Sequence, residues 1–189
     1  MSDVTKRFGR ATGHFGELVH AIDRDQWSAS TPCSEWDVRA LVNHLVYEAR
    51  WVLPMLQGET IERVGTRFDG DLLGADPKTT YDDAVGAAGA AMTAPGALET
   101  TVHLSYGDTP AADYLSQLTV DFLVHSWDLA RGIGADDTLD ADLVVWADEV
   151  ARPQADMLAA SGLFDPPIDV PDDVDPQTKL LALFGRRAM

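Results

Sequence analysis

Apolar residues recur at spacings of three and four along much of the chain, which is the pattern of helices with one buried face. The helices that this pattern predicts cover residues 3–22, 34–53, 80–94, 109–134, 140–161 and 177–184. The fourth stretch gives the strongest signal, and Gly132 or Gly134 supplies its stop. Glycines dilute the first stretch, and the third has only a modest apolar face.

The second of these helices has a marked start and a marked end. Ser34-Glu35-Trp36-Asp37 places a capping residue three positions before an acid, as in a capping box, so we expect the helix to begin at Ser34. Pro54 should kink or end the helix near Leu53, and Gly58 should close the segment.

The segments between the helices carry different signals. Residues 59–77 are polar and contain glycine, which predicts a loop, and residues 165–176 are rich in proline and aspartate, which predicts a surface linker. Residues 100–106 are β-prone and end at a turn signal, Gly107-Asp108. Four longish helices with one small β excursion near 100–107 predict an all-α helical bundle, in which sites are built from inward-projecting side chains.

Length, charge and cysteine content limit the classes of partner and the cellular compartment that we expect for this protein. A length of 189 residues predicts a single domain over 1–189, and a formal charge of −17 disfavours nucleic acid and anionic membranes as partners. The single cysteine, Cys33, rules out an intramolecular disulfide and a Cys-rich metal cluster. The sequence shows no apolar run of about 18 residues and no signal-peptide pattern at the N-terminus, so we expect a cytoplasmic protein.

Asp121 and His125 form the first candidate pair for chemistry. A four-residue spacing within one helix places a carboxylate and an imidazole on the same face about one turn apart, where both could bind one metal ion. The alternative is a simple side-chain pair on a helix surface.

His44 is the second candidate, because it lies among branched aliphatic residues in the middle of the second helix. A histidine in such surroundings needs either a hydrogen bond or a metal ion, so a satisfied core histidine is the alternative interpretation. With Asp121 and His125 it would complete a set of three protein ligands, which leaves a coordination position open for water or substrate. Glu48, one turn after His44, could be a fourth ligand, a supporting partner, a base or a solvated residue.

Other polar residues are weaker candidates. Asp128 could orient His125 through the second ring nitrogen or could pair with Arg131. His103, on the β-prone segment, could approach the site, and Cys33 could be reactive or could serve packing. Motifs for serine hydrolysis, nucleotide binding and ordinary zinc proteolysis are absent from the sequence.

Three motifs of the chain resemble a known family. The residues are 31–44 (TPCSEWDVRALVNH), 121–131 (DFLVHSWDLAR) and 180–186 (LLALFGR). They resemble actinobacterial metal-binding proteins of the DinB-like superfamily that are similar to the N-terminal domain of mycothiol-dependent maleylpyruvate isomerase. The resemblance runs from about residue 5 to residue 187. It implies a DinB-like four-helix bundle with a divalent metal, zinc or nickel, held by His44, Asp121 and His125.

The resemblance also implies a chemistry. Related metalloenzymes use a low-molecular-weight thiol such as mycothiol, which attacks an electrophile as a metal-bound thiolate. Maleylpyruvate isomerase itself carries a second domain that contributes an arginine, whereas this chain ends at Met189, so we expect a related transferase or isomerase-like reaction on a small electrophile. Glu48 and His103 are the candidates for proton transfer in that reaction.

Two other functions stay open at this stage. One is a metal-dependent hydrolase that uses the same ligands to activate water. The other is a non-catalytic bundle that binds a small ligand or a protein partner. Symmetric dimers are the commonest homo-oligomers, so a homodimer is the assembly that we consider for this chain.

Overall fold

The computed structural model describes residues 2–34, 36–155, 157 and 165–188. Its main helices are α1 (Asp3–Ala21), α2 (Val38–Leu56), α4 (Pro77–Thr93), α5 (Ala111–Ile133), α6 (Ala141–Ala151) and α8 (Pro176–Leu183). Short elements lie between them: α3 (Ile61–Val64) and three 3-10 turns at Gln26–Ser28, Ala97–Glu99 and Arg152–Gln154. Two short strands, β1 (Thr101–Leu104) and β2 (Gly107–Pro110), pair antiparallel.

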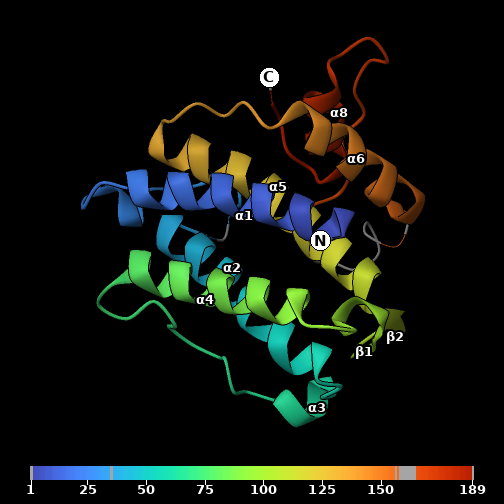
Figure 1. Ribbon diagram of the computed structural model, residues 1–189. Coiled ribbons are helices and arrows are strands. Elements are labelled where there is room, and N and C mark those ends of the chain that lie inside the picture. The colour runs from blue at the N-terminus through green and yellow to red at the C-terminus, as the bar shows by residue number, and fades with distance from the viewer. Residues whose placement is uncertain (1, 35, 156, 158–164, 189) are drawn as a thin grey trace.

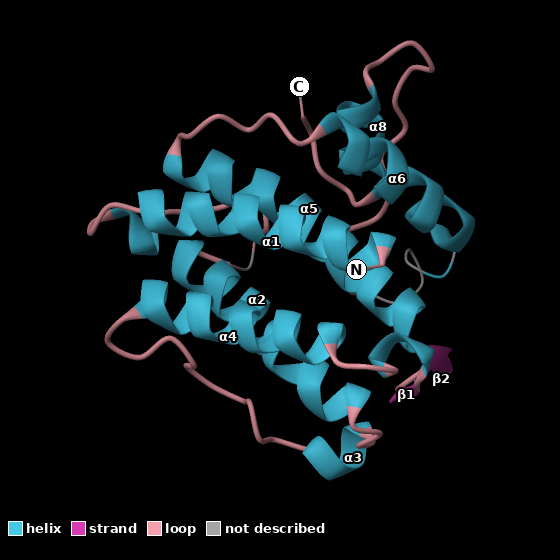
Figure 2. Ribbon diagram, in the orientation of Figure 1, coloured by secondary structure: helices cyan, strands magenta, loops and turns pink. Residues whose placement is uncertain are grey.

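Four helices form a bundle. Helix α1 packs along α5 and α2 packs along α4, while contacts of α1 with α4 and of α2 with α5 join the two pairs (Figure 1). Helices α6 and α8 pack against each other beyond α5. The β1–β2 hairpin is a small excursion beside the start of α5 (Figure 2). The expected all-α bundle with a small β excursion is therefore confirmed.

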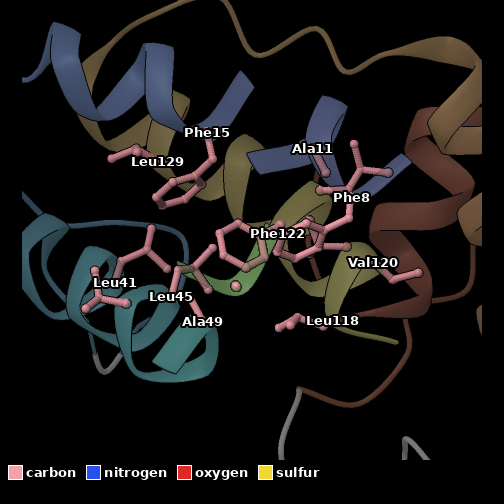
Figure 3. Packing of buried hydrophobic residues seen from close by; sticks show 14 of the residues in the cluster. Phe8, Ala11, Phe15, Leu41, Leu45, Ala49, Leu118, Val120, Phe122 and Leu129 are labelled. Carbon is pink, nitrogen blue, oxygen red and sulfur yellow. The ribbon is translucent and has the colours of Figure 1, made fainter. Parts of the chain in front are cut away.

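Aromatic rings from two helices meet in the core of the bundle. The Phe122 ring on α5 makes edge contacts with Phe8 and Phe15 of α1, at centroid distances of 5.6 and 5.9 Å (Figure 3). Leu41 and Leu45 of α2, both fully buried, belong to the same core. Because Phe122 directly follows Asp121 in the chain, core packing also fixes the turn of α5 that carries a candidate ligand.

The second helix differs from its prediction at both ends. Its N-cap is Asp37, whose side chain accepts a hydrogen bond from the Ala40 amide, so the predicted start at Ser34 is wrong. Ser30 and Asp37 pair in an isolated antiparallel bridge, and the Val38 amide donates to the Ala29 carbonyl, so the described residues between them form a loop with bends. Glu35, which the predicted helix includes, lies outside the described residues. Helix α2 also continues through Pro54 to Leu56, so of the two effects predicted for this proline the end near Leu53 is wrong.

Three further predictions need correction. The predicted loop over 59–77 contains the short helix α3. The predicted turn at Gly107-Asp108 is wrong, because these residues open β2 and the chain turns at residues 105–106. The predicted helix over 140–161 is interrupted, because α6 ends at Ala151 and a 3-10 turn follows at Arg152–Gln154, whereas Ala155 and Met157 are again helical. Residue 156 and residues 158–161 of that prediction lie outside the described residues.

Among the residues that the structure describes, no helix is both long and apolar enough to cross a membrane.

Candidate metal centre

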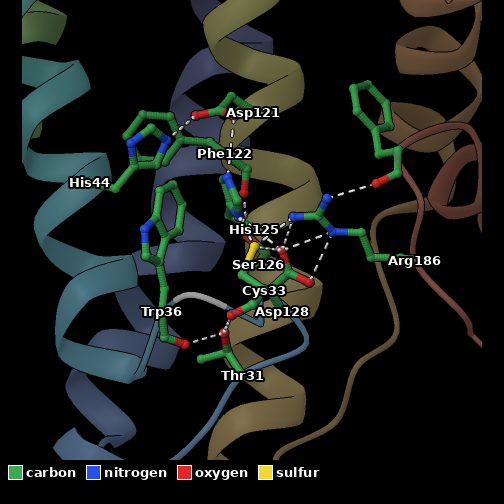
Figure 4. A network of polar contacts seen from close by, with 11 residues as sticks. Thr31, Cys33, Trp36, His44, Asp121, Phe122, His125, Ser126, Asp128 and Arg186 are labelled. Atoms are coloured by element: carbon green, nitrogen blue, oxygen red, sulfur yellow. Dashed lines mark hydrogen bonds and ion pairs between the residues drawn. The ribbon is translucent and has the colours of Figure 1, made fainter. Parts of the chain in front are cut away.

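His44 on α2 faces Asp121 and His125 on α5 across the interior of the bundle (Figure 4). His44 Nε2 lies 3.1 Å from Asp121 Oδ2, and His125 Nε2 lies 3.4 Å from Asp121 Oδ1. One ligand atom from each of the three residues lies within 4.8 Å of the other two. The structure thus brings together the three residues that the sequence nominates as metal ligands.

The chemistry of this donor set fits a divalent ion. Two imidazole nitrogens and a carboxylate suit zinc and nickel, and three protein ligands leave room for water or substrate. The side chains become more exposed from His125 through Asp121 to His44, with relative accessibilities of 3%, 17% and 23%. The centre is therefore mostly enclosed, and His44 is its most exposed member.

Electrostatics show that the site favours a positive charge beside Asp121. Burial disfavours ionised Asp121, yet the imidazoles of His125 and His44 outweigh burial and hold the pKa of this carboxyl well below its usual range. Burial also disfavours protonated His125, but Asp121 outweighs it and raises the pKa of the imidazole well above its usual value. A divalent cation would take the place that a proton fills between these groups.

Asp128 supports His125 from the other side of the ring. Its Oδ2 lies 2.9 Å from His125 Nδ1, and both side chains are buried. Arg131, the alternative partner considered for Asp128, instead pairs with Asp137 at 3.2 Å. A carboxylate on Nδ1 leaves Nε2 facing Asp121 and His44, which is the usual arrangement behind a metal-binding histidine.

Trp36 forms one wall of the centre. Its ring lies 4.5 Å from the His44 ring, centroid to centroid, with a 33° angle between the planes, and 5.6 Å from the His125 ring. The half-buried indole therefore covers both imidazoles and limits how they can turn.

Glu48 lies one turn of α2 after His44 and is electrostatically coupled to the same residues. Burial, reinforced by the negative charge of Asp121, raises the pKa of Glu48 to about 7. A carboxyl group with such a pKa exchanges its proton near neutral pH, as a general acid or base must. Glu48 is outside the group of three ligand atoms.

The raised pKa of Glu48 predicts a pH-dependent stability. The folded protein binds the Glu48 proton more tightly than the unfolded chain does. The contribution of Glu48 to the free energy of unfolding is therefore fully present below the ordinary pKa of 4.5, and it is lost as the pH rises through about 7. Glu48→Gln should remove this contribution, a slope of up to about 1.4 kcal/mol per pH unit. Denaturant unfolding of metal-free wild type and variant between about pH 5 and 7 measures the difference, and parallel pH profiles would contradict the assignment.

His103 lies apart from the three nominated ligands. It is on β1 and pairs across the hairpin with Asp108, at 2.7 Å from Nδ1 to Oδ1, with 41% of its side chain exposed. The structure does not include it in the group of ligand atoms.

Two polar residues of this region were missed by the sequence analysis. Tyr114 lies seven residues before Asp121, on the same face of α5, and its buried hydroxyl has no hydrogen-bond partner among the described residues. Burial, with a contribution from Glu48, raises the pKa of Tyr114. The heptad spacing from Asp121 could have indicated this residue.

Arg186 is the second missed residue, and it reaches the centre from the segment after α8 (Figure 4). Its Nη2 lies 2.8 Å from Asp128 Oδ2 and 2.7 Å from Cys33 Sγ. Cys33 Sγ in turn lies 3.9 Å from His125 Nδ1. Since Arg186 is 58 residues from Asp128 in the chain, no local pattern could have paired them.

Comparison with protein families gives a match over most of the bundle. Residues 8–130 match the family described as the mycothiol maleylpyruvate isomerase N-terminal domain. Two uncharacterized proteins of Mycobacterium tuberculosis, MT0763 of strain CDC 1551 and Rv0738 of strain H37Rv, are each 31% identical to the chain over 140 residues. These alignments cover 72% of this chain and 70% of each relative.

Two solved structures share the fold. The crystal structure of a mycothiol-dependent maleylpyruvate isomerase superposes with a TM-score of 0.57 at 18% identity, and that of a variant with a histidine replaced by alanine superposes with 0.61 at 17%. Each comparison covers 84% of this chain and 70% of the other. At these identities the likeness concerns the fold alone.

Proposed function

Since the chain belongs to the family of mycothiol maleylpyruvate isomerase N-terminal domains, we propose that it is a divalent-metal protein that catalyses a thiol-dependent transferase or isomerase-like reaction on a small electrophile. The observation that carries the proposal is the convergence of His44, Asp121 and His125 from two helices, with Asp128 behind His125. Zinc or nickel is the ion that this donor set suits.

The metal would supply one chemical effect. As a Lewis acid it lowers the pKa of a thiol or water bound at its open position, so that the nucleophile is available near neutral pH. The related isomerases are named as mycothiol-dependent, which makes mycothiol the thiol that we propose as cosubstrate.

The protein's own side chains would prepare the site. Asp128 keeps Nε2 of His125 directed at Asp121, and Trp36 covers the imidazole faces. Glu48, with its pKa of about 7, is the residue that we propose to accept or return a proton. His103 is a weaker candidate for this role, since it is paired with Asp108 on the hairpin.

Cys33 is not the nucleophile in this proposal. Its sulfur lies on the Nδ1 side of His125, in contact with Asp128 and Arg186, whereas the candidate ligand atom of that ring is Nε2. A thiol acting at the metal would therefore come from a small molecule.

The thiol requirement can be tested directly. Metal-loaded protein should convert a small electrophile, with 1-chloro-2,4-dinitrobenzene and maleylpyruvate as first probes, only when mycothiol is added. Omitting either the thiol or the metal should reduce the rate to that of the reaction without protein. Metal-dependent turnover without thiol would instead indicate a hydrolase, and protein that binds neither zinc nor nickel would indicate a non-catalytic bundle.

A further inference from the structure

A chain of contacts connects the C-terminal segment to a candidate metal ligand. Arg186 holds Asp128, and Asp128 holds the Nδ1 edge of His125. We infer that Arg186 is a positioning residue of the metal centre, which sets metal affinity by fixing Asp128 and thereby the orientation of His125. This inference rests on the proposed metal site.

All three side chains in this chain of contacts are buried. The relative accessibilities of Arg186, Asp128 and His125 are 4%, 0% and 3%. Removing one partner of a buried ion pair strongly destabilises a protein, because the remaining charge stays buried without compensation. Without Arg186, the Asp128 carboxylate would therefore lose the partner that holds it beside His125.

The geometry of the pair restricts how Asp128 can turn. Arg186 Nε lies 3.3 Å from both carboxylate oxygens, and Nη2 lies 2.8 Å from Oδ2, the oxygen that also faces His125. The guanidinium is itself held, because Nη1 donates to the Phe184 carbonyl at 2.7 Å. Burial opposes ionisation of Asp128, but the hydrogen bonds of His125 and Arg186 outweigh it and lower the pKa of this carboxyl.

The backbone explains how Arg186 enters the interior. Gly185 has φ of +76°, which side chains other than glycine rarely adopt, and a Cβ there would collide with Asp165. The Arg186 amide then donates to the Leu181 carbonyl at 2.9 Å, which folds the chain back over the end of α8. Arg187, the next residue, is exposed.

The neighbouring arginines supply a matched pair of variants. Arg186→Gln removes the positive charge that contacts Asp128, and Arg187→Gln removes a positive charge one residue further along the chain. We expect Arg186→Gln to weaken zinc binding by about 10–100-fold, the usual effect of losing a partner behind a metal ligand, and Arg187→Gln to leave it unchanged. Competition with a chromophoric chelator measures the zinc affinity of each protein.

A second measurement separates positioning from general loss of structure. In cobalt-substituted wild type, the His125 Nδ1 proton should give a shifted NMR signal that exchanges slowly with solvent, because Asp128 accepts it in a buried site. In Arg186→Gln and Asp128→Asn this exchange should accelerate. If Arg186→Gln does not fold, as judged by circular dichroism, Arg186→Lys and Asp128→Asn carry the same expectation.

The outcomes are distinguishable. Folded Arg186 variants with wild-type zinc affinity and slow Nδ1 proton exchange would overturn the positioning role while leaving the metal site intact. A wild-type protein that binds neither zinc nor nickel would overturn the metal site of the proposed function, and this role with it. Weaker zinc binding and faster Nδ1 proton exchange in the Arg186 and Asp128 variants, but not in Arg187→Gln, would support the inference.

Discussion

Replacing His44 by alanine is expected to reduce the bound zinc or nickel from about one ion per chain to almost none. His44 supplies the only candidate ligand atom of the group that comes from α2, so its loss leaves two donors on a single helix turn. Elemental analysis of protein purified without chelators measures the metal content. Thiol-dependent turnover should disappear together with the metal.

The control for this experiment is another histidine. His20 lies on α1 and pairs with Asp82 at 3.0 Å, on a half-exposed surface outside the candidate centre. His20→Ala should keep its metal, whereas full metal content in His44→Ala would exclude His44 as a ligand. Thermal unfolding of both metal-free variants would show whether either substitution disturbs the fold itself.

Truncation of Phe122 to alanine is expected to lower the free energy of unfolding by about 3–5 kcal/mol. The ring is fully buried and contacts Phe8 and Phe15 edge to face, so its removal leaves a cavity between α1 and α5 that the rigid helices cannot close. Denaturant unfolding of the chelator-treated protein measures the loss without any contribution from metal.

An exposed apolar residue provides the comparison. Val145 on α6 is 51% exposed, so Val145→Ala should change the stability by no more than about 0.5 kcal/mol. A loss for Phe122→Ala of less than about 1 kcal/mol would contradict the packing described for the α1–α5 contact.

The candidate centre was accessible from sequence because its signals are local. Asp121 and His125 are four residues apart in a strongly periodic helix, and His44 is a polar residue among aliphatic ones, which requires a partner. No local pattern predicts that His44 faces Asp121 and His125. The family resemblance supplied that expectation. The structure agrees, with 3.1 Å between His44 and Asp121.

What sequence could not provide depends on contacts between distant segments. Arg186 closes the third motif of the resemblance, but its sequence context names no partner for it. The turn at Gly185 and the contact with Asp128 are visible only in the structure. The start of α2 was misplaced for a related reason, because Ser34 and Asp37 are both good capping residues. The hydrogen bond from the Val38 amide to Ala29, made outside the helix, decides between them.

The separation of the candidate ligands along the chain has a kinetic consequence. His44 and Asp121 are 77 residues apart, and closing a loop of that length costs on the order of 4 kcal/mol of chain entropy. The packing of α2 against α5 must offset this entropy cost before the three donor side chains can come together. An ion at this centre would therefore slow unfolding, because it holds the two helices together, without accelerating the folding that has to assemble its site.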